Sequence, residues 1–168
     1  MTAPDQLADT LRTHFPDVQV ARGEVTVIVP AAEVLASLEY LRSDADLEFD
    51  FLSDLSATDW PDAVPRFWLA YHLFSLRHGH RLRLKAGLAD DAPRIASVTG
   101  LYPTADWFER EVFDFFGVVF DGHPDLRRII MPDDWDGHPL RKDYSLGGVP
   151  TRYKGGDRFY PPIDERGL

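Results

Sequence analysis

Cysteine is absent from the 168-residue sequence. The chain therefore forms no disulfide and binds neither zinc nor an iron–sulfur cluster through thiolates. Long apolar runs are missing too, since the longest candidate, Phe67–Phe74, is far shorter than the ~20 residues that a membrane-spanning helix needs. The first ten residues, MTAPDQLADT, lack the basic start and apolar stretch of a signal peptide. Together these features predict a cytosolic location.

Several catalytic and nucleotide-binding motifs are also missing. The sequence contains no glycine-rich dinucleotide motif after a strand and no phosphate-binding loop in a strand–loop–helix context. It contains neither the two-histidine helix motif of zinc proteases nor the Gly-x-Ser-x-Gly turn of serine hydrolases. The sequence therefore gives no support to the common nucleotide-dependent and hydrolytic enzyme classes.

An excess of basic residues is missing as well, because the net charge is −10. Residues 1–65 hold 13 acidic and 3 basic residues, whereas residues 66–168 hold 15 of each. The acidic part should not bind nucleic acid or anionic lipid. The balanced part is more typical of a contact surface with paired charges, although acidic surfaces also simply keep proteins soluble.

Apolar residues make up 44% of the chain, which is enough to bury a core. Hydrophobic periodicity and turn residues predict helices and strands in alternation. The predicted helices are Asp5–His14, Ala31–Arg42 (opened by Pro30) and residues 105–116; the predicted strands are Glu24–Pro30, one beginning at Leu47, Arg66–Arg77, and Arg81–Gly87. We predict an α+β fold: a single domain over residues 1–144, with a mainly antiparallel sheet and helices packed on one face. Residues 145–168, rich in glycine and proline but carrying aromatic residues, are predicted to be an extended tail that packs on a partner.

Two strands carry further expectations. Leu47, Phe49 and Phe51 alternate with acidic residues, as in a half-buried strand. Arg66–Arg77 has large residues on both faces, which indicates a central or covered strand. The histidines of the following turn, His78 and His80, are expected to be solvated.

The helix over residues 105–116 is expected to begin with Thr104 as its N-cap and to end at Gly117. At ~100° per residue its side chains divide into two stripes. The apolar stripe, expected against the sheet, is Phe108, Val112, Phe115 and Phe116; the charged stripe, expected to face elsewhere, is Trp107, Arg110, Glu111 and Asp114. An exposed Arg110–Asp114 pair would contribute only ~0.3–0.5 kcal/mol, so positioning of neighbouring loops or contact with a partner explains the charged stripe better.

The triplet Gly-His-Pro occurs twice after this helix, around His123 and His138. Both histidines lie near carboxylates that could complete a metal site or an acid–base pair: Asp121, Asp125, Asp136 and Asp143. Proline after each histidine favours stiff, extended loops. Cations close by disfavour a bound metal: Arg127, Arg128, Arg141 and Lys142. Charge-assisted contacts to a neighbour are therefore favoured over catalysis.

Residues 109–130, EREVFDFFGVVFDGHPDLRRII, resemble the signature of the thirty-kilodalton subunit of respiratory complex I, the bacterial proton-translocating NADH:quinone oxidoreductase. The matching positions are Glu109-Arg110-Glu111, Asp114, Phe115-Phe116, His123, Arg127 and Ile129-Ile130. Residues 137–144, GHPLRKDY, are similar to the second block of the same family.

The resemblance implies a non-catalytic structural subunit of the hydrophilic arm, peripheral on the cytoplasmic side of the cell membrane. It implies no cofactor in this chain, with FMN, iron–sulfur clusters and quinone in partner subunits. The implied partners are the quinone-site subunit and the terminal iron–sulfur subunit, with no nucleic acid and only indirect contact with the membrane. The expected interface residues are Glu109, Arg110, Glu111, Asp114, His123, Asp125, Arg127, Arg128, His138, Arg141, Lys142, Asp143 and Tyr144.

Two alternatives stay open at this point. The chain is also compatible with the equivalent subunit of a membrane-bound hydrogenase or a photosynthetic dehydrogenase complex, because the electron donor binds to other subunits. The second alternative is a free-standing metal-dependent enzyme that uses His123 and His138.

Overall fold

The structure, a computed structural model, describes residues 3–88 and 92–144. The predicted tail, residues 145–168, lies outside the described residues. The helical elements are α1 (Pro4–Arg12), the short 3-10 helix η1 (Ala31–Glu33), α2 (Val34–Ser43) and α3 (Ala105–Phe116); the strands are β1 (Val18–Ala21), β2 (Glu24–Pro30), β3 (Phe51–Asp59), β4 (Phe67–Phe74), β5 (Arg81–Leu88), β6 (Arg94–Ala96) and β7 (Val119–Asp121). No helix among the described residues is long and apolar enough to cross a membrane.

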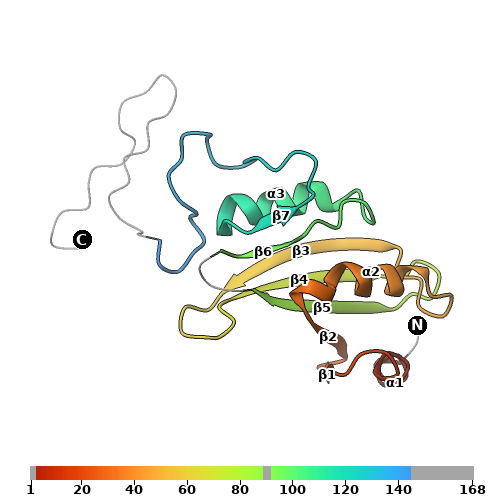
Figure 1. Ribbon diagram of the computed structural model, residues 1–168. Coiled ribbons are helices and arrows are strands. Elements are labelled where there is room, and N and C mark those ends of the chain that lie inside the picture. The colour runs from red at the N-terminus through yellow and green to blue at the C-terminus, as the bar shows by residue number, and fades with distance from the viewer. Residues whose placement is uncertain (1–2, 89–91, 145–168) are drawn as a thin grey trace.

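The main sheet has five strands in the order β1-β2-β5-β4-β3. All neighbours pair antiparallel except β2 and β5, which pair in parallel. Strand β4 lies between β5 and β3, so the prediction of a central strand is confirmed. A second, two-stranded parallel sheet pairs β6 with β7 and lies next to α3 (Figure 1).

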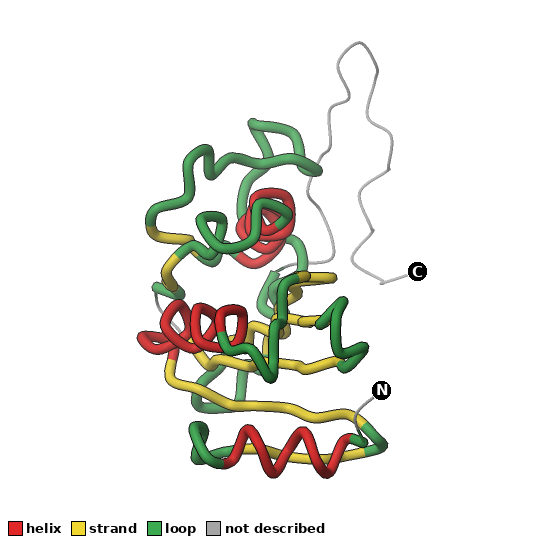
Figure 2. The backbone as a smooth tube through the Cα atoms, turned by 90° about the vertical axis from the view of Figure 1, so that its right-hand side faces the viewer, coloured by secondary structure: helices red, strands yellow, loops and turns green. Residues whose placement is uncertain are grey.

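The core forms where the inward faces of the strands meet the helices. Along β4 the odd-numbered residues from Phe67 to Leu73 are buried, and along β5 the even-numbered residues from Leu82 to Leu88 are buried. Helix α2 lies in front of the sheet, α1 beside its β1 edge and α3 beyond β3 (Figure 1). This arrangement confirms the predicted α+β fold with a mainly antiparallel sheet. After β7 the chain passes around α3, the uppermost helix of Figure 2.

The prediction for the start of β3 is wrong. Leu47 and Phe49 are buried, but they precede the strand, which begins only at Phe51. Glu48 has a φ of 40°, which breaks an extended conformation, and the pairing register with β4 shifts between Leu52 and Asp54. Phe51 is therefore 43% exposed.

The turn histidines also differ from expectation, because they fasten the β4–β5 turn to the connection before β3. His80 is buried, and its Nε2 lies 3.0 Å from the carbonyl of Leu47. The His78 ring lies 3.2 Å from the carbonyl of Ala45. Burial lowers the pKa of His80, so its neutral form is favoured.

Candidate functional site

Helix α3 positions most of the candidate residues, and its two ends are built differently. Gly117 ends the helix in the left-handed conformation with a φ of 73°, and its amide donates to the carbonyl of Phe113 at 2.9 Å, which confirms its predicted role. Thr104 holds the N-cap position but makes no side-chain cap. Its hydroxyl instead lies 3.4 Å from the carbonyl of Leu52 in β3, so the predicted capping role is wrong.

The expected charged stripe is divided between the interior and the surface. Arg110 and Asp114 are buried, whereas Trp107 and Glu111 are exposed. Arg110 and Asp114, which are one turn apart and could have paired, form no ion pair with each other in the described part of the chain. The Arg110 guanidinium lies 5.0 Å from the Trp107 ring centroid, and its Nε donates to the carbonyl of Arg127 at 3.3 Å.

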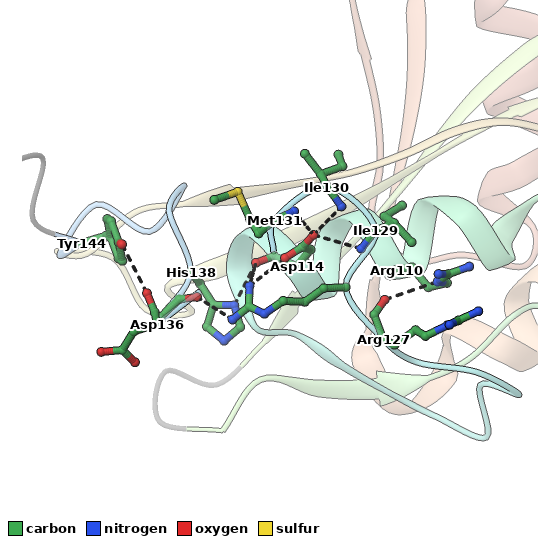
Figure 3. A network of polar contacts seen from close by, with 11 residues as sticks. Arg110, Asp114, Arg127, Ile129, Ile130, Met131, Asp136, His138 and Tyr144 are labelled. Carbon is green, nitrogen blue, oxygen red and sulfur yellow. Dashed lines mark hydrogen bonds and ion pairs between the residues drawn. The ribbon is translucent and has the colours of Figure 1, made fainter. Parts of the chain in front are cut away.

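Asp114 fixes the chain that follows the first Gly-His-Pro triplet (Figure 3). Its Oδ2 accepts hydrogen bonds from the backbone amides of Ile129, Ile130 and Met131 at 3.1, 2.8 and 2.9 Å. Its Oδ1 accepts a charge-assisted bond from Arg128 at 2.7 Å. Burial alone would raise the pKa of Asp114, but these donors outweigh burial and lower it, so the carboxylate stays ionised.

The second triplet is held to the same turn of α3. Nδ1 of His138 donates to the backbone carbonyl of Asp114 at 3.0 Å, and Arg128 also donates to the carbonyl of Gly137 at 2.8 Å. The His138 ring packs on Gly117, where a Cβ atom would come within 2.5 Å of it. Thus Asp114 connects α3 to both loops, which confirms the expectation that this part of the helix positions them.

His123 lies at the other end of the helix. Its side chain is fully buried, and its Nδ1 accepts from the amide of Asp125 at 3.0 Å. Nε2 therefore carries the proton and donates toward Asp106, whose carbonyl is 3.2 Å away.

The two histidines cannot share a ligand. Asp106 and Asp114, which hold them, are eight residues apart in one helix, or ~12 Å along its axis. Within the described residues no group of three His, Asp or Glu side chains could hold a metal ion. The geometry therefore contradicts a metal site or acid–base pair built from His123 and His138 together.

A second cluster of polar contacts, which the sequence did not suggest, holds the second Gly-His-Pro segment at the end of β3 and the start of β4. Asp59 accepts two bonds from Arg66, at 2.6 and 2.9 Å, and a third from the amide of Lys142 at 2.7 Å. Arg66 also pairs with Asp143 at 2.9 Å. The bonds from Arg66 are the largest cause that lowers the pKa of Asp59. No local pattern could reveal this contact, because 83 residues separate Asp59 from Lys142.

Glu109 also differs from its predicted role at an interface. Its Oε1 accepts from the amide of Val98 at 2.7 Å, while Oε2 is buried without a hydrogen-bond partner among the described residues. Burial raises the pKa of Glu109. Glu109 therefore fastens α3 to the turn after β6 and is not available to a partner.

The remaining predicted residues lie at or near the surface. Glu111, Lys142 and Asp143 are exposed, and Asp125 and Arg127 form an exposed pair at 2.8 Å. The half-buried Arg141 guanidinium lies 4.9 Å from the Phe67 ring centroid, and the Tyr144 hydroxyl donates to the carbonyl of Asp136 at 3.2 Å. We use the name docking surface for residues 122–144, the segment that holds most of the interface residues expected from the sequence. Its buried polar groups fix the backbone, and its exposed charges face outward.

Known proteins resemble the chain over most of its length. Residues 27–150 match the family described as "Respiratory-chain NADH dehydrogenase, 30 Kd subunit". The corresponding NADH-quinone oxidoreductase subunit of Nocardioides sp. is 48% identical over 93% of this chain, and that of Salinispora arenicola is 45% identical over 96%. This chain spans only 62% and 69% of those two relatives.

Two solved structures share the fold. A trypsin-resistant fragment of Nqo5 superposes with a TM-score of 0.62 at 30% identity, covering 73% of this chain and 97% of the fragment. A chain of the membrane-bound sulfane sulfur reductase, an archaeal respiratory membrane complex, gives 0.74 at 25% identity, covering 94% of this chain and 98% of that one. By its sequence match and its fold, this chain belongs to the family of the 30 kDa subunit of respiratory-chain NADH dehydrogenase.

Proposed function

We propose that the chain is a structural subunit of an NADH:quinone oxidoreductase, the complex that transfers electrons from NADH to quinone and couples this to proton translocation. The observation that carries the proposal is the match of residues 27–150 to the family, together with NADH-quinone oxidoreductase relatives that are 45–48% identical over nearly the whole chain. The role of the chain is to dock other subunits and not to carry electrons itself.

The arrangement of the docking surface supports a role in assembly. Asp114 and Arg128 bind backbone groups and each other, and Asp59 binds Arg66 and the amide of Lys142, which makes the loops rigid. A rigid loop loses little conformational entropy when a partner binds, so its exposed charges meet the partner already oriented. In this proposal Asp125, Arg127 and their exposed neighbours make the contacts, while the buried carboxylates act only through the loops that they hold.

The chemistry of the sequence supports redox centres in other subunits. Without cysteine the chain supplies no thiolate for an iron–sulfur cluster. FMN, the clusters and quinone therefore belong to partner subunits in this proposal. The chain lies on the cytoplasmic side of the membrane and packs on the quinone-site subunit and on the subunit with the terminal cluster.

A second candidate is the equivalent subunit of a related respiratory membrane complex with another electron donor or acceptor. The similarity to a chain of the sulfane sulfur reductase complex favours it, because that similarity also spans 94% of this chain. The identity is only 25%, against 48% for an NADH-quinone oxidoreductase relative, so the NADH:quinone assignment is preferred.

Affinity purification of the tagged chain from native membranes in mild detergent tests the proposal. We expect a large assembly that contains flavin and iron–sulfur clusters and oxidises NADH with a quinone acceptor. An assembly without NADH oxidation would support the second candidate. A chain that elutes alone, at the 19.1 kDa of its own mass, would contradict both.

A further inference from the structure

The connection between β3 and β4, residues 60–65, exposes apolar side chains beside the docking surface. Trp60 is 59% exposed and Val64 is fully exposed, at 101%. Leu140, in the second Gly-His-Pro segment, is 46% exposed. The bond from the Lys142 amide to Asp59 brings that segment against the start of the connection. Figure 1 shows both at the same end of the sheet.

Residues 60–65 form an ordered loop, because several contacts fix them. The amide of Trp60 donates to the carbonyl of Arg66 at 3.0 Å, and the amide of Ala63 donates to the carbonyl of Trp60 at 2.9 Å. The Trp60 indole donates to the Thr58 hydroxyl at 3.1 Å. At the other end of the loop, the Pro65 ring occupies the space where a Cβ atom of Gly87 would lie.

Folding stability does not explain why these side chains face water. Apolar side chains of this size stabilise a fold when they are buried, and Trp60 and Val64 contribute little of that stabilisation where they lie. Rigid, exposed tryptophan is instead typical of the residues that dominate binding at protein interfaces. Because the loop is already ordered, it would lose little conformational entropy when a partner binds.

The charges around the loop indicate which partner fits. The exposed charged residues there are Lys142, Asp62, Asp136 and Asp143, and because Asp143 pairs with Arg66 at 2.9 Å, the others carry one more acidic than basic charge. A surface of this sign repels anionic lipid headgroups, so it does not suit a membrane surface. It complements an apolar pocket with lysine or arginine at its rim.

We propose that Trp60 and Val64, with Leu140 beside them, insert into an apolar pocket with a basic rim on another subunit. This inference rests on the proposed function, since it assumes an assembly, but it adds a contact outside residues 109–144, where all the interface residues expected from the sequence lie. No pattern in the sequence selects residues 60–65, because only the fold brings them to the docking surface.

The test uses the tagged full-length chain expressed in place of the native one. Trp60→Ser combined with Val64→Ser should lower the fraction of the chain in the large assembly at least ~tenfold, as expected for residues that dominate an interface. The matched control is Leu76→Ser, which alters a 65% exposed leucine at the opposite end of β4 and should leave assembly unchanged. Thermal unfolding of each purified variant by circular dichroism verifies that the domain folds.

A double variant that assembles like wild type would overturn the inference while leaving the proposed function intact. Failure of wild type to assemble would overturn both. If the double variant does not fold, a photo-crosslinking amino acid is placed at position 64 of the otherwise unchanged chain, and the crosslinked product in the assembly identifies what this position contacts. Crosslinks to an apolar peptide flanked by lysine or arginine in another subunit support the inference. Crosslinks to lipid, to a second copy, or to residues 145–168 of the same chain, or no crosslink at all, contradict it.

Discussion

Two carboxylates on one helix illustrate how local surroundings give the same functional group opposite properties. Asp114 is fully buried and faces three amides and a guanidinium, so its charged form is stabilised. Glu109, also fully buried, receives a single amide bond, and its second oxygen has no partner among the described residues. The pKa of Asp114 is lowered and that of Glu109 is raised. Their effects on stability should therefore depend on pH in opposite directions.

Replacing Asp114 tests the first effect. Asp114→Asn removes the charge that Arg128 and the three amides bind, so the free energy of unfolding should fall by ~2–4 kcal/mol at pH 7. A lowered folded-state pKa contributes stability above the unfolded value of ~3.9, and this is lost as pH falls through the folded pKa. Urea unfolding from pH 7 to pH 3 should therefore show a shallower acid decline in Asp114→Asn than in wild type.

Asp125→Asn is the matched control for this experiment, because Asp125 is exposed and should change stability by less than ~0.5 kcal/mol. Equal acid slopes in wild type and Asp114→Asn would show that Asp114 does not hold the loop as an ionised group.

Glu109 provides the opposite case. A raised folded-state pKa contributes stability that is full below the unfolded value of ~4.3 and is lost as pH rises through the folded pKa. Glu109→Gln keeps an oxygen for the Val98 amide but cannot ionise. At pH 8 the variant should be as stable as wild type or more stable, by up to ~1–3 kcal/mol, the cost of an unsatisfied buried polar group. Chemical unfolding at pH 5 and pH 8 measures this, and a variant clearly less stable than wild type at pH 8 would contradict it.

At the scale of the element, the end of α3 determines where the second Gly-His-Pro loop lies. Gly117 has a φ of 73° and contacts the His138 ring. An alanine there would have an unfavourable backbone conformation, and its Cβ atom would clash with that ring. Gly117→Ala should cost ~2 kcal/mol or more and speed amide exchange in residues 137–144. Gly100→Ala is the control, since a Cβ atom there meets nothing within 4 Å. Equal stability of the two variants would show that the helix end does not position the loop.

Elements with a strong local pattern were predictable from the sequence. The alternation in Arg81–Gly87, the helix after Pro30 and the glycine at the end of α3 all correspond to structural features. The start of β3 was not predictable, because Leu47 and Phe49 have the spacing of a strand but are buried in a connection that Glu48 turns. Hydrophobic spacing therefore identified Leu47 and Phe49 as buried, but it grouped the 43% exposed Phe51 with them and left the backbone path undetermined.

The candidate site was only partly predictable, for a related reason. Helical periodicity correctly grouped Arg110 and Asp114 on one stripe, but it could not show that the chain after β7 covers these two residues and leaves Trp107 and Glu111 exposed. The partners of Asp114, Asp59 and Glu109 include backbone amides. Almost every residue has such an amide, so the residue types do not reveal these partners. The family motif includes Glu109, Arg110 and Asp114, and the structure shows that these three residues lie in the interior.

At the scale of the whole molecule, the balanced charges of residues 66–168 have two separate uses. Some pair internally, as Arg128 does with Asp114 and Arg66 with Asp59, and these fix the loops. Others, such as Asp125, Arg127 and Lys142, stay at the surface. We infer from this division that the docking surface, residues 122–144, is where the chain meets its partners in the complex.

Hydrogen–deuterium exchange, compared between the isolated chain and the purified assembly, reports on this surface amide by amide. Amides of residues 129–131 already bond to Asp114 and should change little. We expect the amides of residues 126–127 and 133–138, apart from that of Trp135, which already bonds to the carbonyl of Pro132, to exchange at least ~tenfold more slowly in the assembly, since a partner would exclude water from them. Unchanged exchange in both segments, with protection gained only elsewhere in the chain, would show that the chain docks through a different surface.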